Sequence, residues 1–465
     1  MENQPNLSTG RNLKIGLFHL GSGMADVITT GIWNRIMISD LGFSATPIGL
    51  LVALRYFLAP LGVWAGRMSD RRAIGGYRRL FWIWLGRGMM AISIFLLGYL
   101  TALFARGVPA EAIHWIGMTF AMLLFSLGSA FSGSTFLALI YDRTNENQRG
   151  RAVGIVWTFL LLGYTVAGFL FGVLLPAHTD GETGLSFTPE TLLNLFIIAG
   201  LVLSGLWVVS VMGEERRTPV RAAVGTNNGA QAEPSSSLLS DLKLAWSNRQ
   251  TRYFFWYLAL SMMFAFSQDL ILEPFAGDVF AMEARQTTRF AAYWGSMAIL
   301  GTIVFLILSR RVKWLTNTTM NYLGVGLLVV TFGIFALSSF AEIRPLVTIG
   351  LITLGLGLGM WNVGTLGLMM DMSPFGRAGT FLGFWTLVVT LARGVGVSGG
   401  GMLRDLFLSF NGGDFASGYG WVFVLGAGGL IVALVFLSRV NVRQFRESYP
   451  SQPVEAEKVF AGAMD

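Results

Sequence analysis

The segment GRMSDRRAIGGYRR, residues 66–79, lies between two apolar runs at 46–66 and 80–105. Each run has about 20 residues or more, which is the length that a helix needs to cross the hydrocarbon core of a membrane. The segment between them carries five arginines and two adjacent glycines, as expected of a short basic turn on the cytoplasmic side of a membrane. This alternation of apolar runs with a basic turn predicts a helical membrane protein.

The alternation continues along the whole chain of 465 residues, of which 53% are hydrophobic and 13% are charged. The first run is the most polar, because Asp26, Asn34 and Arg35 interrupt it, and such a helix is expected to face the bundle interior or a cavity. Ten further runs bring the expected total to twelve transmembrane helices in an all-α fold: 14–38, 114–140, 152–175, 191–212, 253–275, 288–309, 319–340, 345–370, 379–402 and 418–438.

Lysine and arginine are distributed unequally between alternate loops. One set of loops and the N-terminal segment hold most of them, whereas the other set holds only Arg106, Arg285, Arg289, Arg344 and Arg404. The positive-inside rule therefore places the basic loops and both termini in the cytoplasm. The net charge of +7 is explained by this topology, so we expect the lipid membrane and no nucleic acid as a partner.

A long polar segment divides the runs into six and six. We expect an N-terminal half at 1–212, a cytoplasmic linker at 213–252, a C-terminal half at 253–440 and a cytoplasmic tail at 441–465. Apolar residues at helical spacing in 238–246 predict an amphipathic helix at the membrane surface, although a soluble cap on the next helix has the same pattern.

An internal repeat supports this division. Arg149, Gly168 and Gly172 recur at the same spacing as Arg377, Gly396 and Gly400. Two six-helix halves related by such a repeat are typical of transporters whose binding site lies between the halves.

The segment SQDLILEPFAGDVF, residues 267–280, carries the most distinctive polar pattern. A continuous helix would place Asp269 and Glu273, four residues apart, on one face, and no basic residue lies in the same segment to neutralise them. We expect that the pair either has a function or lies in water. Pro274, together with Gly277, is expected to break or kink the helix.

The segment at 66–79 resembles the signature loop of the major facilitator superfamily. The resemblance implies that Gly66 allows close helix contact, that Asp70 bonds a helix end or an arginine, and that Arg71 and Arg78 follow as the basic residues of a conformational motif. The alternative is a basic turn without any such role.

Several charged side chains fall inside the runs or at their ends. Buried charges are commonly paired, so we expect interhelical ion pairs for most of them, and an unpaired member would mark a cavity. In the next basic loop, Asp142 and Arg151 either pair or line a solvated turn. The intramembrane charges are Asp26, Arg35, Arg55, Arg87, Asp371 and Arg393.

Three further stretches resemble the bacteriochlorophyll delivery family of the major facilitator superfamily, which includes the PucC and LhaA proteins: 17–42, 268–295 and 359–372. Gln268, Asp269 and Glu273 match the family's most specific run. The resemblance implies that the protein binds or delivers (bacterio)chlorophyll as cargo and assists assembly of light-harvesting antenna polypeptides. It also implies a cytoplasmic or photosynthetic inner membrane.

His19 departs from that family, in which glutamine is expected at its position. A neutral imidazole in the first helix either ligates the magnesium of a chlorin, relays protons or hydrogen-bonds to a neighbouring helix. With Asp26 and the run at 268–273, His19 completes the candidate residues for pigment binding or for lining a cavity.

The sequence offers no pattern for catalysis. It has no cysteine, three scattered histidines, and no spacing typical of a phosphate-binding loop or a protein-bound metal, so neither an enzyme nor a nucleotide-driven pump is expected. Two alternatives to pigment delivery stay open. One is a proton-coupled small-solute transporter that protonates Asp269 or Glu273, and the other is an assembly factor that docks antenna polypeptides and transports nothing.

Overall fold

The computed structural model describes residues 7–144, 146–176, 187–215, 246–374 and 378–448. In these residues the chain is helical apart from its connections, in which Ile74 and Tyr77 form an isolated β-bridge. The first group of helices comprises α1 (Thr9–Val27), η1 (Ile28–Trp33), η2 (Ile36–Asp40), α2 (Ala45–Phe57), α3 (Pro60–Arg71), α4 (Leu80–Ala105), α5 (Ala112–Arg143), α6 (Glu146–Leu174) and α7 (Pro189–Val211).

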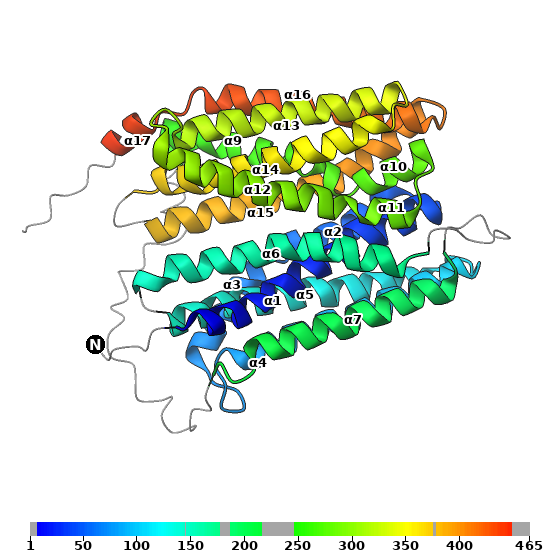
Figure 1. Ribbon diagram of the computed structural model, residues 1–465, viewed down its shortest axis with the longest axis horizontal. Helices are drawn as coiled ribbons and strands as arrows, with labels where there is room; N and C mark the ends of the chain where they lie inside the picture. The colour runs from blue at the N-terminus through cyan, green and yellow to red at the C-terminus, as the bar shows by residue number, and fades with distance from the viewer. Residues whose placement is uncertain (1–6, 145, 177–186, 216–245, 375–377, 449–465) are drawn as a thin grey trace, which may run out of the picture.

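The second group lies alongside the first, and the helices of both groups run roughly along one axis (Figure 1). It comprises α9 (Arg249–Ala265), η4 (Ser267–Asp269), α10 (Leu272–Phe280), α11 (Ala284–Thr288), α12 (Phe290–Arg311), α13 (Asn317–Phe340), α14 (Pro345–Asp371), α15 (Ala378–Phe410), α16 (Phe415–Leu437) and the short α17 (Val442–Ser448). The expected helix at 238–246 falls almost entirely outside the described residues, and the exact boundaries of the two halves stay a prediction.

Ten helices in the described residues are long and apolar enough to cross a membrane, and an eleventh is added if the bent pair formed by α9–η4 and α10 counts as one span. The segment from α1 to η2 is the remaining one of the twelve expected. It is absent from that set, in agreement with the polar residues that interrupt it. The expected number of helices is therefore consistent with the structure.

Two of the segments expected to cross the membrane are interrupted. The first changes from α-helix to the π-helical turns η1 and η2, and such turns are frequent at functional sites. The second is divided at Pro60, which occupies the first turn of α3, where its missing N–H group is not needed.

Glycines allow the closest helix contacts inside the first group. A Cβ on Gly86 of α4 would lie 2.9 Å from the backbone nitrogen of Ser132 and would also collide with the carbonyl oxygen of Gly128 on α5. Gly88, two residues further along α4, has no atom within 4 Å of the same position. Gly86 is therefore needed for packing, whereas Gly88 is free to vary.

We expect Gly86→Ala to lower the free energy of unfolding by about 1–3 kcal/mol, because backbone atoms cannot yield to the added methyl group. The matched variant Gly88→Ala should be neutral or slightly stabilising, since alanine favours a helix more than glycine does. Thermal unfolding of the two purified variants measures the difference. Equal midpoints would show that α4 and α5 can separate without cost.

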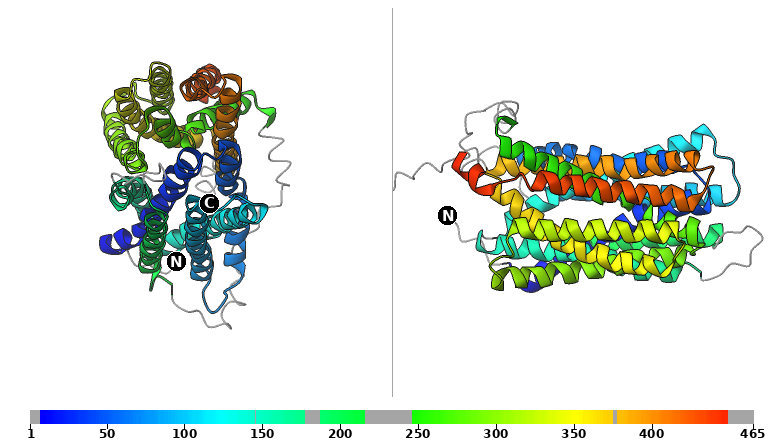
Figure 2. Two further views of the ribbon diagram at one scale, coloured as in Figure 1. Left: turned by 90° about the vertical axis from the view of Figure 1, so that its right-hand side faces the viewer. Right: turned by 90° about the horizontal axis from the view of Figure 1, so that it is seen from above.

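The most extensive contacts between the two groups lie along two pairs of helices. α2 packs on α15, where a Cβ on Gly49 would lie 3.4 Å from the Cα atom of Ser398 and a Cβ on Gly401 would collide with the carbonyl oxygen of Ala45. α6 packs on α12, where a Cβ on Gly168 would lie 2.6 Å from the backbone nitrogen of Ala292. Figure 2 shows the two groups from the end of the bundle and from above.

Both contacts lie toward the same end of the bundle. We call the end with the loops at 72–79 and 312–316 the basic end, and the end with the loops at 41–44 and 411–414 the opposite end (Figure 1). α2 begins at the opposite end and α6 ends there, so the close glycine contacts hold the two groups together in that half of the bundle.

Candidate functional site

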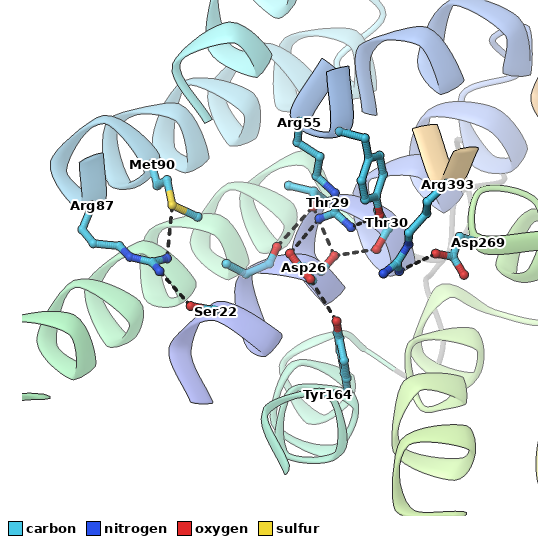
Figure 3. A network of polar contacts seen from close by, with 12 residues as sticks. Ser22, Asp26, Thr29, Thr30, Arg55, Arg87, Met90, Tyr164, Asp269 and Arg393 are labelled. Carbon is cyan, nitrogen blue, oxygen red and sulfur yellow. Dashed lines mark hydrogen bonds and ion pairs between the residues drawn. The ribbon is translucent and has the colours of Figure 1, made fainter. Parts of the chain in front are cut away.

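Asp26, near the end of α1, connects this helix to α2 and α6 (Figure 3). Its carboxylate forms an ion pair with Arg55 of α2 at 2.7 Å and accepts a hydrogen bond from the hydroxyl of Tyr164 of α6 at 3.0 Å. The Asp26 side chain is 25% exposed although it lies near the middle of the segment that runs from α1 to η2. The Asp26 carboxylate is therefore held by two partners and is still accessible to solvent or to a ligand.

A second ion pair lies close to the first and belongs to the other group of helices (Figure 3). Arg393 of α15 contacts the Asp269 carboxylate at 2.7 Å, and the side-chain amide of Gln268 donates to the same carboxylate at 2.7 Å. The side chains of Arg393 and Asp269 are 27% and 16% exposed, respectively. The guanidinium of Arg393 also lies 3.9 Å from the ring centroid of Phe266.

Tyr56 of α2 connects the two ion pairs. Its hydroxyl accepts a hydrogen bond from Arg55 at 2.5 Å, and the guanidinium of Arg393 lies 5.2 Å from its ring centroid. We call this set the central polar layer: Asp26, Arg55, Tyr56, Tyr164, Asp269 and Arg393. It spans both groups of helices and lies where their close glycine contacts end.

The structure corrects the expectation for Asp269 and Glu273. They do not share one face of a continuous helix, because Asp269 ends η4 whereas Glu273 lies in the first turn of α10, which is bent by 42° from the helix before it. Asp269 is also neutralised, by an arginine 124 residues away in the sequence. The expectation that no basic residue neutralises the two carboxylates was therefore wrong for Asp269.

The position of the break differs from the expected one as well. The helix is interrupted at 266–271, before Pro274, which lies in the first turn of α10 where it leaves no hydrogen bond unmade. Gly277 does not break α10 either. A Cβ there would collide with the guanidinium of Arg35 and the hydroxyl of Ser39, so this glycine allows η2 to pack against α10.

Glu273 lies against the first group of helices. It is buried, with 5% of its surface exposed, and one carboxylate oxygen would lie 3.6 Å from a Cβ placed on Gly31 of η1. Next to it, the side-chain amide of Asn34 donates to the carbonyl oxygen of Leu270 at 2.7 Å. The segment 268–273 thus packs on the interrupted part of the first segment.

His19 lies apart from the central polar layer, toward the basic end of α1. It is buried, and its ring centroid lies 5.1 Å from that of Phe136 and 5.9 Å from that of Trp157. Its Nδ1 atom has no hydrogen-bond partner among the described residues. The interpretation that His19 bonds to a neighbouring helix therefore finds no support at this atom.

Most of the intramembrane charges are paired, as expected. Besides the two pairs of the central polar layer, Arg35 pairs with Asp40 at 2.8 Å and Asp371 pairs with Arg446 at 2.7 Å. Arg87 is the exception, because no carboxylate of the described residues pairs with it.

Hydrogen bonds close the opposite end between the two groups. Asp405 of α15 accepts from the backbone N–H groups of Ala45 and Thr46 at 3.1 and 2.7 Å and from the Thr46 hydroxyl at 2.8 Å, so it caps the start of α2. Arg35 donates to the carbonyl oxygen of Met282 at 2.9 Å. Among the described residues, all hydrogen bonds that join the two groups lie in this half of the bundle.

A buried pair beside Asp405 was not identified from the sequence. Arg404 contacts Asp278 at 2.8 Å and Asp405 at 2.9 Å, and Tyr419 donates to Asp278 at 2.6 Å. Arg404 was interpreted only as one of the few basic residues on its side of the membrane. Its neighbour Asp405, directly after the apolar run at 379–402, was the available signal.

At the basic end, the structure assigns the roles of the expected loop motif to neighbouring residues. Asp70 pairs with Arg79 at 2.5 Å and only weakly with Arg78, at 3.9 Å. Arg79 also pairs with Asp142 at 2.9 Å, so that carboxylate has an interhelical partner. Arg71, at the end of α3, makes no ion pair with any described residue.

Gly66 likewise differs from its expected role, because the nearest atom to a Cβ placed there is Cβ of Ser134, at 4.0 Å. The close contact between α3 and α5 is made instead at Gly62, one helical turn earlier. A Cβ there would lie 2.6 Å from the carbonyl oxygen of Ala130.

We expect Arg79→Gln to lower the free energy of unfolding by about 1–3 kcal/mol, because it removes charge-assisted hydrogen bonds to Asp70 and Asp142 from a buried guanidinium. The matched variant Arg78→Gln should change it by no more than about 0.5 kcal/mol, since the Arg78 side chain is exposed. Thermal unfolding distinguishes the two. An equal loss in both would show that Arg78 contributes to the motif as much as Arg79 does.

The family model described as PUCC protein matches residues 32–445. The bacteriochlorophyll synthase 44.5 kDa chain of Rhodobacter capsulatus is 28% identical to this chain over 92% of it and 94% of the relative. The protein PucC of Rhodovulum sulfidophilum is 28% identical, over 86% of each chain. These names support a role related to photosynthesis.

The fold is shared with solved transporters. A bacterial homologue of the human lysosomal transporter Spinster, in an inward-facing and unoccupied conformation, superimposes with a TM-score of 0.72 over 96% of this chain and all of that one, at 16% identity. The expected major facilitator fold of a multi-pass membrane protein is thus confirmed. Because the PUCC protein model matches most of the residues, the chain belongs to the PUCC protein family.

Proposed function

We propose that this protein binds or delivers (bacterio)chlorophyll and assists the assembly of light-harvesting antenna complexes, as a binding or transport protein and not as an enzyme. The observation that carries the proposal is the match of residues 32–445 to the PUCC protein family, with relatives whose names include bacteriochlorophyll synthase 44.5 kDa chain. The expected site of action is an inner membrane, with both termini in the cytoplasm.

The chemistry around His19 supports a pigment as cargo. A chlorin presents a large apolar face and one metal that accepts an axial ligand, so its carrier needs aromatic surface and few polar groups. The Nδ1 atom of His19 has no hydrogen-bond partner, and the rings of Phe18, Phe136 and Trp157 surround it. A neutral imidazole in this setting would hold the magnesium of the pigment, while the rings would exclude water from it.

The test is an absorption spectrum of the protein purified from its native membrane in mild detergent. We expect a chlorin band at about one pigment per chain, which His19→Ala shifts or removes. The matched control is His114→Ala, because His114 lies at an exposed helix start and bonds only its own helix end. A colourless wild-type protein would contradict pigment binding and favour the docking of antenna polypeptides without cargo.

A proton-coupled small-solute transporter is the second candidate, and the shared fold with a transporter favours it. In that function, Asp269 or Glu273 would exchange the proton. Glu273 is the better candidate, because Asp269 is paired with Arg393. Proton-dependent uptake into vesicles that is lost in Glu273→Gln, with normal expression, would establish this function, whereas an unaffected variant would exclude Glu273 from the site.

A further inference from the structure

Arg87 is a buried arginine that forms no ion pair with the described residues. Only 6% of its surface is exposed. Its guanidinium donates to the hydroxyl of Ser22 at 2.9 Å and contacts the sulfur of Met90 at 3.2 Å, and its Nε atom has no partner (Figure 3). Burying an unpaired charge costs several kcal/mol, so this arrangement requires an explanation.

Other buried polar atoms near Arg87 also lack hydrogen-bond partners among the described residues. The Nδ1 atom of His19 and the indole Nε1 atom of Trp207 are also buried without a hydrogen-bond partner. The Arg87 guanidinium lies 4.7 Å from the ring centroid of Trp207 and 3.9 Å from that of Phe18, which stacks on His19. The cluster therefore offers positive charge, polar atoms without partners and aromatic surface, but holds no acidic group.

Ser22 connects this cluster to the central polar layer. Ser22 and Asp26 of α1 and Thr30 of η1 recur every four residues and form a partly exposed polar stripe along this segment. Arg87 contacts the stripe at Ser22, one helical turn from Asp26. A ligand that lies along this stripe would place its end at Arg87.

We propose that Arg87 binds the carboxylate of an amphiphilic ligand whose apolar body packs on the surrounding aromatic rings. A carboxylate supplies the missing charge, and a guanidinium holds it through two parallel hydrogen bonds. The next step rests on the proposed function. If the cargo is a tetrapyrrole, this site favours one that keeps a free propionate over the fully esterified pigment.

The test compares matched acids and neutral analogues on the full-length protein in lipid nanodiscs. One pair is bacteriochlorophyllide and its methyl ester, and the other is dodecanoate and dodecanol. We expect each acid to bind about tenfold more tightly than its analogue in the wild type, with the ratio falling to about one in Arg87→Gln and being partly kept in Arg87→Lys. The comparison within the wild type needs no variant, so it is valid even if Arg87→Gln does not fold.

The outcomes separate this inference from the proposed function. Equal binding of bacteriochlorophyllide and its ester, together with equal binding of the dodecyl pair, would overturn the inference but still support pigment binding. Arg87-dependent binding of dodecanoate without any pigment binding would support the carboxylate site and contradict the proposed function. If neither acid binds, the inference is overturned.

Discussion

Replacing Arg393 with glutamine is expected to abolish the protein's activity and to leave a folded but less stable protein. The change removes the counter-charge of Asp269 inside the bundle, at an ion pair of 2.7 Å. Breaking a fully buried pair costs about 3–5 kcal/mol, and the partial exposure of both side chains reduces the expected loss to about 1–3 kcal/mol. Thermal unfolding measures the stability, and antenna absorption in a complemented deletion strain measures the activity.

The double variant Asp269→Asn/Arg393→Gln distinguishes a functional role from a structural one. It leaves neither charge without a partner, so most of the lost stability should return. The activity should stay absent if the charges act on cargo or on the movement of the two groups. Full activity in the double variant would show that the pair only stabilises the fold.

The surface pair of Arg446 and Asp371 provides the matched control. It has the same length, 2.7 Å, but the arginine is largely exposed to solvent at the basic end. Arg446→Gln should therefore cost no more than about 1 kcal/mol and leave the activity unchanged. A comparable loss of activity there would indicate that any charge change impairs this protein.

The fold could be predicted because hydropathy and length decide it locally. The run expected at 80–105 has the same bounds as α4, and the helices at 317–340 and 345–371 begin and end within two residues of the expected ones. Such runs need no knowledge of tertiary contacts, since a bilayer requires each of them to be helical.

The candidate site could be predicted only in part, because its partners lie far apart in the sequence. Asp26 was identified as an intramembrane charge and Asp269 as one of a pair with Glu273, but nothing local indicates that Arg55 reaches Asp26 and Arg393 reaches Asp269. The helix was also expected to continue through residue 269 as far as Pro274. Glu273 was therefore placed before the bend, whereas it lies after it. No proline marks that bend, so a pattern that assumes a continuous helix cannot detect it.

The basic loop shows the same limit at shorter range. Two neighbouring arginines, Arg78 and Arg79, fit the motif almost equally well in sequence. Only the packing of α3 against α5 buries one and leaves the other in solvent. The same packing makes Gly62 the close contact in place of Gly66.

Replacing Asp405 with alanine is expected to open the opposite end of the bundle. Asp405 accepts three hydrogen bonds from Ala45 and Thr46, and it joins α15 to the start of α2. Hydrogen bonds to a charged group contribute about 1.5–3 kcal/mol each, and water replaces part of this when the groups separate. We therefore expect the open form to gain on the order of 10- to 100-fold in population, which corresponds to about 1.4–2.8 kcal/mol.

The natural chain has no cysteine, so a single introduced thiol reports this opening without background. Ser398 is suited to it, because it is buried and its Cα atom would lie 3.4 Å from a Cβ on Gly49 of α2. In Ser398→Cys, a water-soluble maleimide should react slowly. In Ser398→Cys/Asp405→Ala the reaction should be faster in proportion to the gain of the open form.

Asp414→Ala provides the control for this experiment. Asp414 lies at the same end and caps α16 through Ser417, but it makes no hydrogen bond to the first group of helices. Its loss should weaken one helix end and leave the labelling rate unchanged. If both substitutions accelerated the labelling equally, local weakening of any helix end at the opposite end would be enough to expose the introduced thiol. Acceleration by Asp405→Ala alone would identify the cap on α2 as the contact that keeps the two groups closed.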